Sequence, residues 1–423
     1  MRIQFHKPDV LLIESPTSTA LDLDLDVMYI ILSILPRPDL VRLMSTCRTF
    51  NRAGVRHLLH FNVHLNHIRT LKSFCAFMVA QAPIRYPFLR RLSIYRFCPP
   101  PPYKSVNQLI KILKHASHLE MLYVESNDPL DSEDRLQAAC SSLTSLKEFH
   151  ISWMSGRVSG EEPLYKMVEQ MQSLPSIFHA TLEDLTLYTP TFQSELLFPR
   201  MRKLSVRDAN PPLALIAQNF PALLDLTILN CRGDDASLSP EDHQDRQLHR
   251  SVQLSGGGWK SLDRLAGGAF DLYRLGLTCQ IRWVTIFDVD SCTHDVVAHI
   301  LRDSHEVAAR LTYLRCTIDL AFFDGIPSAL DTFRLLLQRS PLTHLMLRFT
   351  AYASMDTVGA RLVREFRPEV FASQIIASHP SIRYIVIKIN HAEQLFWKVL
   401  TTESGEVVVD KALKEDISVV MDL

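Results

Sequence analysis

LDLDVMYIILSILPRPDLVRLMSTCRTFNRAGVRHLLH, residues 23–60, is the stretch that decides the N-terminal fold. Apolar side chains recur in it at steps of three and four residues, which is the spacing of one helix face. Pro36 and Pro38 end the first such run, because proline lacks a backbone N–H and clashes with the preceding turn. Asp39 can then cap a second helix. The first helix presents Met28, Ile31, Leu32 and Leu35, and the second presents Leu40, Leu43, Met44 and Cys47.

The length of this stretch limits what it can do alone. At 38 residues it falls just below the roughly 40 residues with which a domain buries enough surface to fold by itself. Its apolar stripes must therefore be covered by the downstream chain or by another protein.

The stretch resembles the F-box, a small three-helix motif. The matching residues are Leu23, Asp26, Ile31, Leu32, Leu35, Pro36, Asp39, Leu40, Leu43, Cys47, Arg48 and Phe50. The family's usual leading Leu-Pro is Leu23 and Asp24 here. The resemblance implies a docking element for the adaptor subunit of cullin-based (SCF-type) ubiquitin ligases, with the rest of the chain selecting the substrate.

The same resemblance implies which residues contact the adaptor: Leu23, Met28, Ile31, Leu35, Pro36, Leu40 and Leu43. On this basis, Leu40→Asp is expected to abolish adaptor binding and to leave the rest of the chain folded, because burying an unpaired carboxylate is costly. The alternative is an ordinary helical hairpin with no outside partner.

The composition is that of a folded protein. The 423 residues suffice for two or three domains or for one elongated array, and 47% are hydrophobic while 22% are charged. A net charge of −1 gives no global signal for nucleic acid or a membrane surface. The eight cysteines form no CxxC pair, which favours reduced thiols. No apolar run approaches the ~18 residues of a membrane span, and no signal peptide is evident, so we expect a cytoplasmic or nuclear location.

A repeated apolar triplet, spaced L-x-x-L-x-L, dominates the chain from Leu89 onward. Its copies are 89/92/94, 119/122/124, 146/149/151, 182/185/187, 201/204/206, 223/226/228, 272/275/277, 311/314/316, 342/345/347 and 382/385/387. The last two members of each triplet are two residues apart, which places them on one face of a short strand. Before the triplets, residues 61–65 alternate as a strand does, and residues 69–82 have a helical pattern.

Helical patterns lie between the triplets, at 106–113, 164–174, 295–309, 329–337 and 368–377. Strand and helix alternate in units of mostly 20 to 40 residues, which resembles a leucine-rich repeat. We therefore predict an α/β fold, in which an irregular solenoid over residues 61–400 has parallel strands on its concave face and helices outside. Residues 1–22 form a flexible arm and 401–423 a cap or tail. A compact α/β sheet is the alternative.

Two features interrupt the repeat. Residues 232–251 are polar and lack apolar periodicity, so they are predicted to be a long excursion from the solenoid. Gly256, Gly257 and Gly258 follow without the spacing of a phosphate-binding loop, and they indicate a turn.

No catalytic or metal site emerges from the sequence. His57, His60, His64 and His67 are clustered, but their segment does not form one helical pattern and no cysteine or carboxylate lies beside them. They are therefore predicted to be surface and turn histidines. No nucleophile, paired carboxylate or cofactor motif is apparent, and we expect neither enzymatic activity nor a cofactor.

The target-binding surface can be located from strand alternation. If triplet offsets +3 and +5 are buried, offsets +2, +4 and +6 face the concave side. These positions include Tyr95, Tyr123, Tyr188, Tyr313 and Tyr384. Tyrosine is frequent in binding hot spots, although it also simply suits strands.

Charge divides these concave positions into two halves. The early repeats place Glu125, Glu148, Asp184 and Asp225 there, and the late repeats place Arg274, Arg315, Arg348 and Lys388. We therefore predict that the target contributes an acidic or phosphorylated segment to the C-terminal half.

Two function classes remain open. The first is a substrate receptor for ubiquitin-dependent protein degradation. The second is a non-ligase scaffold or regulatory repeat protein whose F-box-like helices only cap the solenoid. An enzyme on an α/β core is a third, less favoured class.

Overall fold

The structure is a computed structural model that describes residues 24–125, 134–152, 177–188, 196–207, 213–229, 238–290, 293–306, 311–319, 337, 342–350, 366–389, 394–401 and 407–411. The chain divides into two compact units, Met1–Phe61 and Asn62–Leu423. Three predicted segments lie outside the described residues: the arm 1–22, the helix 164–174, and the helix 329–337 except for Leu337.

Three short helices make up the described part of the first unit: α1 (Leu25–Ile34), α2 (Arg37–Met44) and α3 (Arg48–Leu58). The Asp24 carboxylate caps α1 by accepting the backbone N–H of Asp26 at 3.1 Å. Pro36 and Pro38 separate α1 from α2, as the sequence predicts. The predicted cap is wrong, because Pro36 is the N-cap of α2 and Asp39 lies in its first turn. The core consists of Met28, Leu32, Leu40, Met44, Ala53, Val55 and Leu59.

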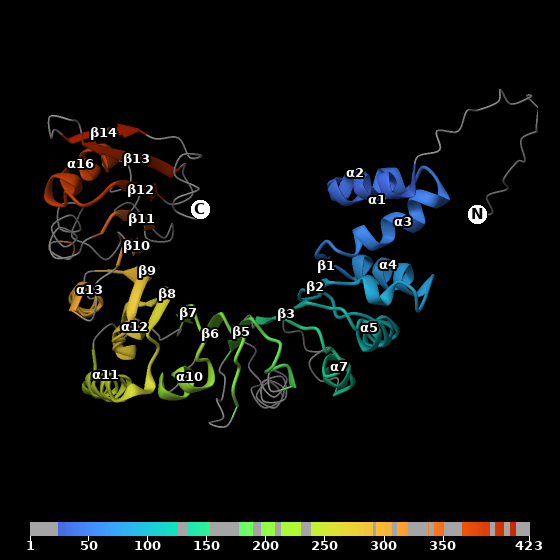
Figure 1. Cartoon of the computed structure of the whole chain (residues 1–423), viewed down its shortest axis with the longest axis horizontal. Coiled ribbons are helices and arrows are strands. Elements are labelled where there is room, and N and C mark those ends of the chain that lie inside the picture. Colours follow the sequence, from blue (N-terminus) through green and yellow to red (C-terminus); the bar gives the residue numbers. More distant parts are fainter. Residues whose placement is uncertain are drawn as a thin grey trace, which may run out of the picture. The chain divides into compact units, whose positions relative to one another are not determined.

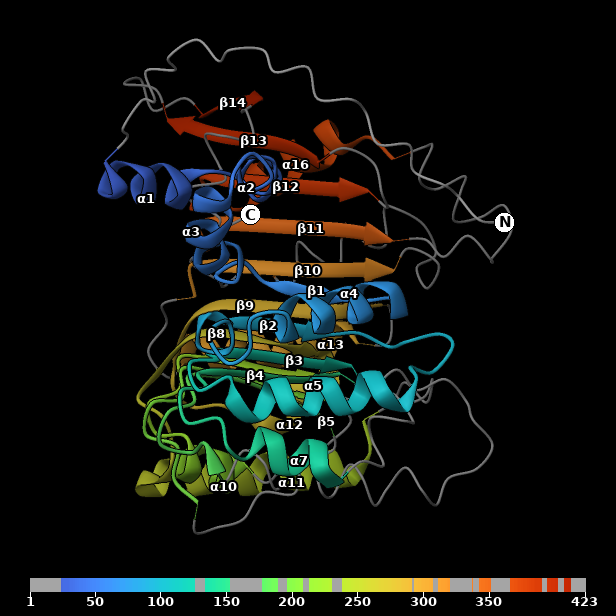
Figure 2. The same cartoon turned by 90° about the vertical axis from the view of Figure 1, so that its right-hand side faces the viewer.

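The described strands of the second unit form one 14-stranded sheet in which the strands follow chain order. They are β1 (Val63–Leu65), β2 (Arg91–Ile94), β3 (Met121–Glu125), β4 (Glu148–Ser152), β5 (Asp184–Tyr188), β6 (Lys203–Arg207), β7 (Asp225–Leu229), β8 (Ser261–Gly268), β9 (Gln280–Val289), β10 (Tyr313–Asp319), β11 (His344–Thr350), β12 (Tyr384–Ile389), β13 (Gln394–Thr401) and β14 (Val407–Lys411). Neighbours pair in parallel up to β12, and β13 and β14 pair antiparallel. Figure 2 shows β10, β11 and β12 pointing one way and β13 the other.

Helices cover one face of this sheet (Figure 1). They are α4 (Ile68–Val79), α5 (Tyr103–His115), α7 (Asp134–Cys140), α10 (Leu213–Asn219), α11 (Pro240–Val252), α12 (Ala269–Leu275), α13 (His294–Glu306) and α16 (Pro368–Ser378), with short turns η1 (Tyr86–Phe88) and η2 (Gln253–Gly257). The sheet face opposite these helices is called the open face below. The helices predicted at 69–82, 106–113, 295–309 and 368–377 correspond to α4, α5, α13 and α16.

Nine of the ten triplets form strands with offsets +3 and +5 buried on the helix side, as predicted. In β3 these are Leu122 and Val124, and in β11 they are Leu345 and Leu347. Parallel register lays equivalent positions side by side, as in the pairing of Leu122 with Phe149. Each repeat thus buries its apolar face against helices and neighbouring repeats, which is the packing of a repeat array. The predicted α/β fold with helices on one side of parallel strands is confirmed.

The remaining triplet, 272/275/277, does not form the predicted strand. Leu272 and Leu275 lie in α12, and the strands of this region are β8 and β9. Triplet spacing begins at Leu262 in β8, but Gly267 occupies the last apolar position. A Cβ on Gly267 would lie 2.7 Å from the Ile228 carbonyl oxygen and 2.7 Å from Leu272 Cδ2. Glycine is needed there because α12 packs directly on the strand backbone.

The excursion predicted at 232–251 is also partly wrong, because α11 begins at Pro240. The Ser239 hydroxyl accepts the N–H of Asp242 at 3.2 Å, and the Asp242 carboxylate accepts the N–H of Ser239 at 2.9 Å. This reciprocal capping box stabilises the first turn of a helix that is otherwise mostly polar. Residues 232–237 lie outside the described part.

The C-terminal end of the sheet extends past the predicted boundary of the solenoid at residue 400, since β14 reaches Lys411. Within the described ranges, none of the helices is both long and apolar enough to traverse a bilayer.

Replacing Gly267 by alanine tests the close packing of α12. We expect Gly267→Ala to destabilise the second unit by about 1–3 kcal/mol, because the added methyl forces strand and helix apart. Urea unfolding of the full chain measures the effect. The matched control is Gly268→Ala, whose Cβ would meet only the Asp271 carboxylate, at 3.1 Å. Equal stability of the two variants would contradict this account.

Candidate functional site

The open face is organised in rows that cross the strands. Parallel register aligns one outward residue of each strand from β5 to β12: Asp184, Lys203, Asp225, Arg264, Trp283, Tyr313, His344 and Tyr384. Charges of both signs occupy the part over β5–β8, and rings occupy the part over β9–β12. The row therefore changes from charged to aromatic side chains along the sheet.

Four stacked rings form the aromatic row, defined as Trp283, Tyr313, His344 and Tyr384. Successive ring centroids are 4.7, 4.1 and 4.9 Å apart, with interplanar angles of 6°, 24° and 18°. Tyr313 and His344 are buried. Close stacking of neighbouring rings on one sheet face stabilises strand pairing and holds each ring in place.

His344 is the titratable member of this row. Its Nδ1 lies 2.7 Å from Thr343 Oγ1, and its Nε2 is buried without a hydrogen-bond partner in the described part of the chain. Burial, reinforced by the positive charges of Arg383 and Arg282, lowers the pKa of His344 to about 4. The ring is therefore neutral at physiological pH, which suits its place between two tyrosines.

A group of cations lies on the open face beside the aromatic row. This basic cluster consists of Arg315, Arg348 and Lys388. Arg348 pairs directly with Lys388 across β11 and β12, and Arg315 on β10 is the partner of Met346, two residues before Arg348. Like charges placed opposite each other destabilise a sheet.

No acid compensates the basic cluster within the described residues, where no ion pair of these three side chains occurs. The Nε atoms of Arg315 and Arg348 are buried and have no hydrogen-bond partner there. Burial and the charge of Arg348 lower the pKa of Arg315. A cluster of this composition has the chemistry to bind an anionic group.

The acids of the earlier strands have cationic partners instead. Glu148 pairs with Arg91 at 2.8 Å, and Asp184 pairs with Lys203 at 4.0 Å. Burial raises the pKa of Asp225, while Arg264 and Lys203 oppose the shift. The acidic half of the open face is thus balanced internally, unlike the basic half.

A hollow of about 470 Å³ lies on the open face. Its lining runs from His150 on β4 to Arg315 on β10 and includes Asp184, Asp225, Trp283 and Phe287. The hollow therefore connects the internally balanced acidic half with the basic cluster.

The predicted tyrosines all lie on strands at open-face positions or directly after them. Tyr123, Tyr188, Tyr313 and Tyr384 belong to β3, β5, β10 and β12, and Tyr95 follows β2. Tyr95 lies between His64 and Tyr123, with ring centroids 5.9 and 5.2 Å away. Tyr95 and Tyr123 are therefore remote in the sheet order from the basic cluster.

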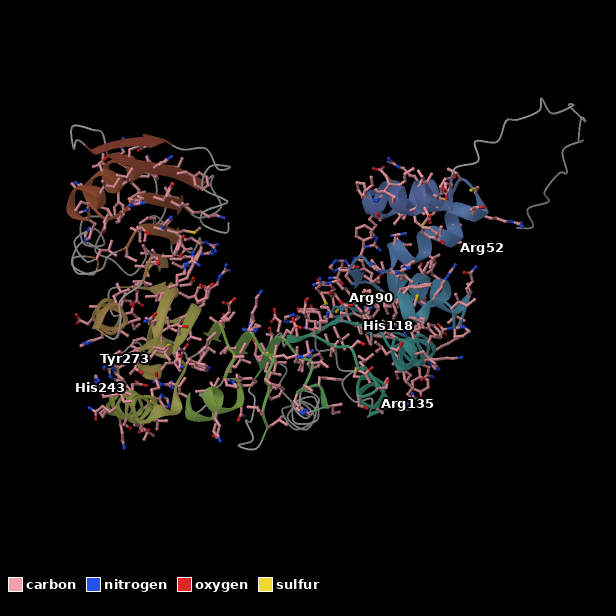
Figure 3. All side chains as sticks on the ribbon, viewed as in Figure 1. Arg52, Arg90, His118, Arg135, His243 and Tyr273 are labelled. Carbon is pink, nitrogen blue, oxygen red and sulfur yellow. The ribbon has the colours of Figure 1, made fainter. Side chains whose placement is uncertain are left out.

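Arg274 is not on the open face, which corrects its predicted place in the target site. It lies in α12, with 5% of its side chain exposed, and its Nε donates to Asp242 at 3.0 Å. The neighbouring Tyr273 meets His243 of α11 in the helix layer (Figure 3), where the Tyr273 hydroxyl and His243 Nδ1 are 2.7 Å apart. Arg274 therefore holds two helices together and cannot meet a target.

Sequence reasoning missed Trp283, Phe287 and His344. Trp283 and Phe287 lie on β9, which was not predicted, although Ile281, Val284 and Ile286 have the triplet spacing. His344 occupies offset +2 of a predicted triplet. Both signals were available from the sequence alone.

Apolar side chains are exposed on the first unit. They are Val27, Tyr29, Ile30 and Ile34 on α1 and Val41 on α2, with exposures of 44%, 44%, 62%, 74% and 47%. A three-helix unit with such a surface fits a docking module, because clustered exposed apolar side chains mark interaction sites.

Comparison with protein families gives a match in the N-terminal part of the chain. The model of the F-box domain matches residues 20–62. The N-terminal unit is an F-box domain. No curated protein matches the chain.

The F-box residues predicted to contact the adaptor have different accessibilities. Ile31, Leu35 and Leu43 are partly exposed, Pro36 is exposed, and Leu23 lies outside the described residues. Met28 and Leu40 are core residues, 4% and 0% exposed. Leu40 Cδ1 lies 3.5 Å from where a Cβ on Gly54 of α3 would be, so Leu40 is packed between helices. The expectation for Leu40→Asp is corrected accordingly: it would unfold the F-box rather than remove a surface contact.

The clustered histidines occupy four separate places. His57 lies in α3, His60 follows it, His64 lies in β1 and His67 caps α4. Across the described residues, no group of three or more histidine, cysteine or acidic side chains is arranged to hold a metal ion.

The lowered pKa of His344 predicts an acid-linked loss of stability. Between the unfolded value of about 6.5 and the folded value of about 4, the unfolded chain binds a proton that the folded chain does not. The free energy of unfolding therefore falls as pH drops through this range. We expect His344→Phe, which keeps a ring in the row, to reduce this fall in urea titrations at pH 7 and pH 4.5. An unchanged pH dependence would contradict the buried neutral histidine.

Proposed function

We propose that this protein is the substrate-recognition subunit of an SCF-type ubiquitin ligase. The F-box at 23–60 docks the adaptor and, through it, a cullin, and the repeat region at 61–400 binds the target protein on its open face. The hairpin of β13 and β14 closes the parallel array and, with residues 401–423, acts as its cap. The chain has no catalytic role in this proposal; it brings a target to the ligase in the cytoplasm or nucleus.

The observation that carries the target-binding part is the basic cluster. Arg315, Arg348 and Lys388 lie together on the open face, without acidic partners among the described residues, beside the aromatic row. An acidic or phosphorylated segment of the target would relieve their repulsion, and arginine can bind such a group through two parallel hydrogen bonds. The tyrosines predicted for target contact divide here. Tyr313 and Tyr384 flank His344 near the cluster, while Tyr188 lies on β5, five strands before β10 in the sheet.

The adaptor-binding part is supported by the F-box match together with the exposed apolar side chains of α1 and α2. Ile30, Ile34 and Val41 offer accessible apolar area, and the partly exposed Ile31, Leu35 and Leu43 can add to it. Burial of such area on binding is the main favourable term in association.

Ile34→Glu tests adaptor docking without disturbing the F-box core. Ile34 is 74% exposed, so we expect the variant to stay folded and to weaken adaptor binding at least tenfold, because a charge would be buried at the interface. Isothermal titration with purified adaptor measures the effect. Ile84→Glu is the control, since Ile84 is 67% exposed and lies outside the F-box.

The same experiment separates the receptor from the alternative scaffold. If the wild-type chain does not bind the adaptor, the F-box helices serve only to cap the repeat region, as in the scaffold hypothesis. If Ile34→Glu binds as tightly as wild type, the exposed apolar side chain of Ile34 is not part of the adaptor surface.

Reversing the charges of the basic cluster tests target binding. We expect Arg315→Glu with Arg348→Glu to reduce target capture more than tenfold, because two anion-binding groups become repulsive. Adaptor binding and melting temperature should stay at wild-type values, since neither arginine has an ion pair in the described part of the chain. Proximity labelling in cells, with and without the F-box, identifies the captured targets.

A matched double reversal controls for net charge: Arg202→Glu with Arg367→Glu changes two exposed arginines by the same amount. Equal loss of capture in both double variants would show that overall charge, and not the basic cluster, selects the target.

A further inference from the structure

A row of small side chains lies on the open face over β5–β9. They are Thr186, Ser205, Thr227, Ala266 and Thr285, and each is paired in register with the next. All five line the hollow on the open face. This row therefore forms the floor of the hollow, and larger side chains of the same strands lie on either side of it.

The side chain of this row is smallest on β8. Ala266 is followed on the open face by Gly268, which has no side chain, so that β8 contributes only a methyl group at these two positions. On β9, Thr285 pairs with Ala266. The residues two positions before and after Thr285 are Trp283, the partner of Arg264, and Phe287, the partner of Gly268. Both rings line the hollow.

A bulge and a stack fix these two rings. On β9, Ile286 pairs with Cys316 and Val289 pairs with Ile318. The two residues of β9 between these pairs therefore lie opposite a single residue of β10, Thr317. One of the two is Phe287, and a bulge re-aims the side chain that it contains. Trp283 lies against Tyr313, with centroids 4.7 Å apart, and the Arg264 guanidinium is 5.1 Å from its ring centroid.

The hollow is continuous with the basic cluster. Ala266 pairs with Thr285, and Thr285 pairs with Arg315, so Ala266 and Arg315 are two strand spacings apart. Two spacings amount to roughly 10 Å, about the length of three residues of an extended chain. Arg315 itself lines the hollow.

We propose that the space over Ala266, between Trp283 and Phe287, receives a bulky apolar side chain of the target. This side chain lies two to four residues from the acidic or phosphorylated residue that the basic cluster binds. The inference rests on the proposed function and deepens it, because it turns a general preference for negative charge into a two-part motif. The aromatic walls supply the apolar contact, and the arginines of the basic cluster supply the charge recognition.

The test uses the purified full chain and a degenerate peptide library with a fixed central phosphoserine and five randomised positions on each side. Bound peptides are sequenced, and a matched library with serine at the centre is the reference. We expect phenylalanine, leucine or tryptophan to be enriched about tenfold at one position two to four residues from the phosphoserine, since burying such a side chain favours binding by about that factor.

Variants assign the enrichment to the hollow. Ala266→Trp fills the space, and Phe287→Ala removes one wall; both should abolish selection for the bulky residue and retain selection for phosphoserine. Retained phosphoserine selection also shows that each variant is folded. Thr186→Trp adds the same bulk at the β5 end of the row, three strands away, and should leave the apolar selection intact.

The outcomes distinguish the two proposals. Phosphoserine selection without apolar selection, or apolar selection unchanged in Ala266→Trp and Phe287→Ala, overturns this inference and leaves the proposed function standing. Equal recovery from the phosphoserine and serine libraries overturns the role of the basic cluster, and with it the anionic target segment of the proposed function.

Discussion

The structure of the second unit depends on the burial of alternate strand residues against the helices. Side chains alternate between the two faces of a strand, so burying Leu345 and Leu347 of β11 forces His344, Met346 and Arg348 onto the open face. A shift by one residue would bury the charge and expose the leucines, which makes the register strongly specified. Because neighbouring strands are parallel and in register, the same constraint aligns the outward residues of different repeats. The aromatic row and the basic cluster are both consequences of this alignment.

Strands could be predicted from the sequence wherever a pattern within the strand itself determines them. An apolar triplet is visible in the sequence and is sufficient for nine strands. Gly267 shows the limit, because its cause is contact with Leu272 and with the Ile228 carbonyl, which no local pattern reveals. Two other omissions had visible signals: Ile281, Val284 and Ile286 have triplet spacing, and the capping box of Ser239 and Asp242 marks the start of α11.

The sequence predicted the positions of the candidate site residues better than their exposure to solvent. Alternation places Tyr313, Arg315 and Arg348 on the open face, but the same offset rule fails for Arg274, whose segment is a helix and whose partner Asp242 is 2% exposed. In the F-box, Leu40 and Ile34 both belong to predicted apolar stripes. Leu40 is buried because α3 packs against it at Gly54, whereas Ile34 stays exposed. Accessibility depends on contacts between elements, and a single-helix pattern does not contain them.

The two units offer surfaces of different chemistry, and this difference suits their proposed roles. The F-box exposes apolar side chains such as Ile30 and Ile34, whose burial would supply affinity for a constant partner. The open face instead presents Arg315 and Arg348 beside rigid rings, and electrostatic complementarity contributes more to the choice of partner than to affinity. Because the core residues of each strand fix the fold, residues on the open face can be replaced without changing it. If the proposed function holds, a repeat array of this kind can therefore change its target while its docking to the ligase stays the same.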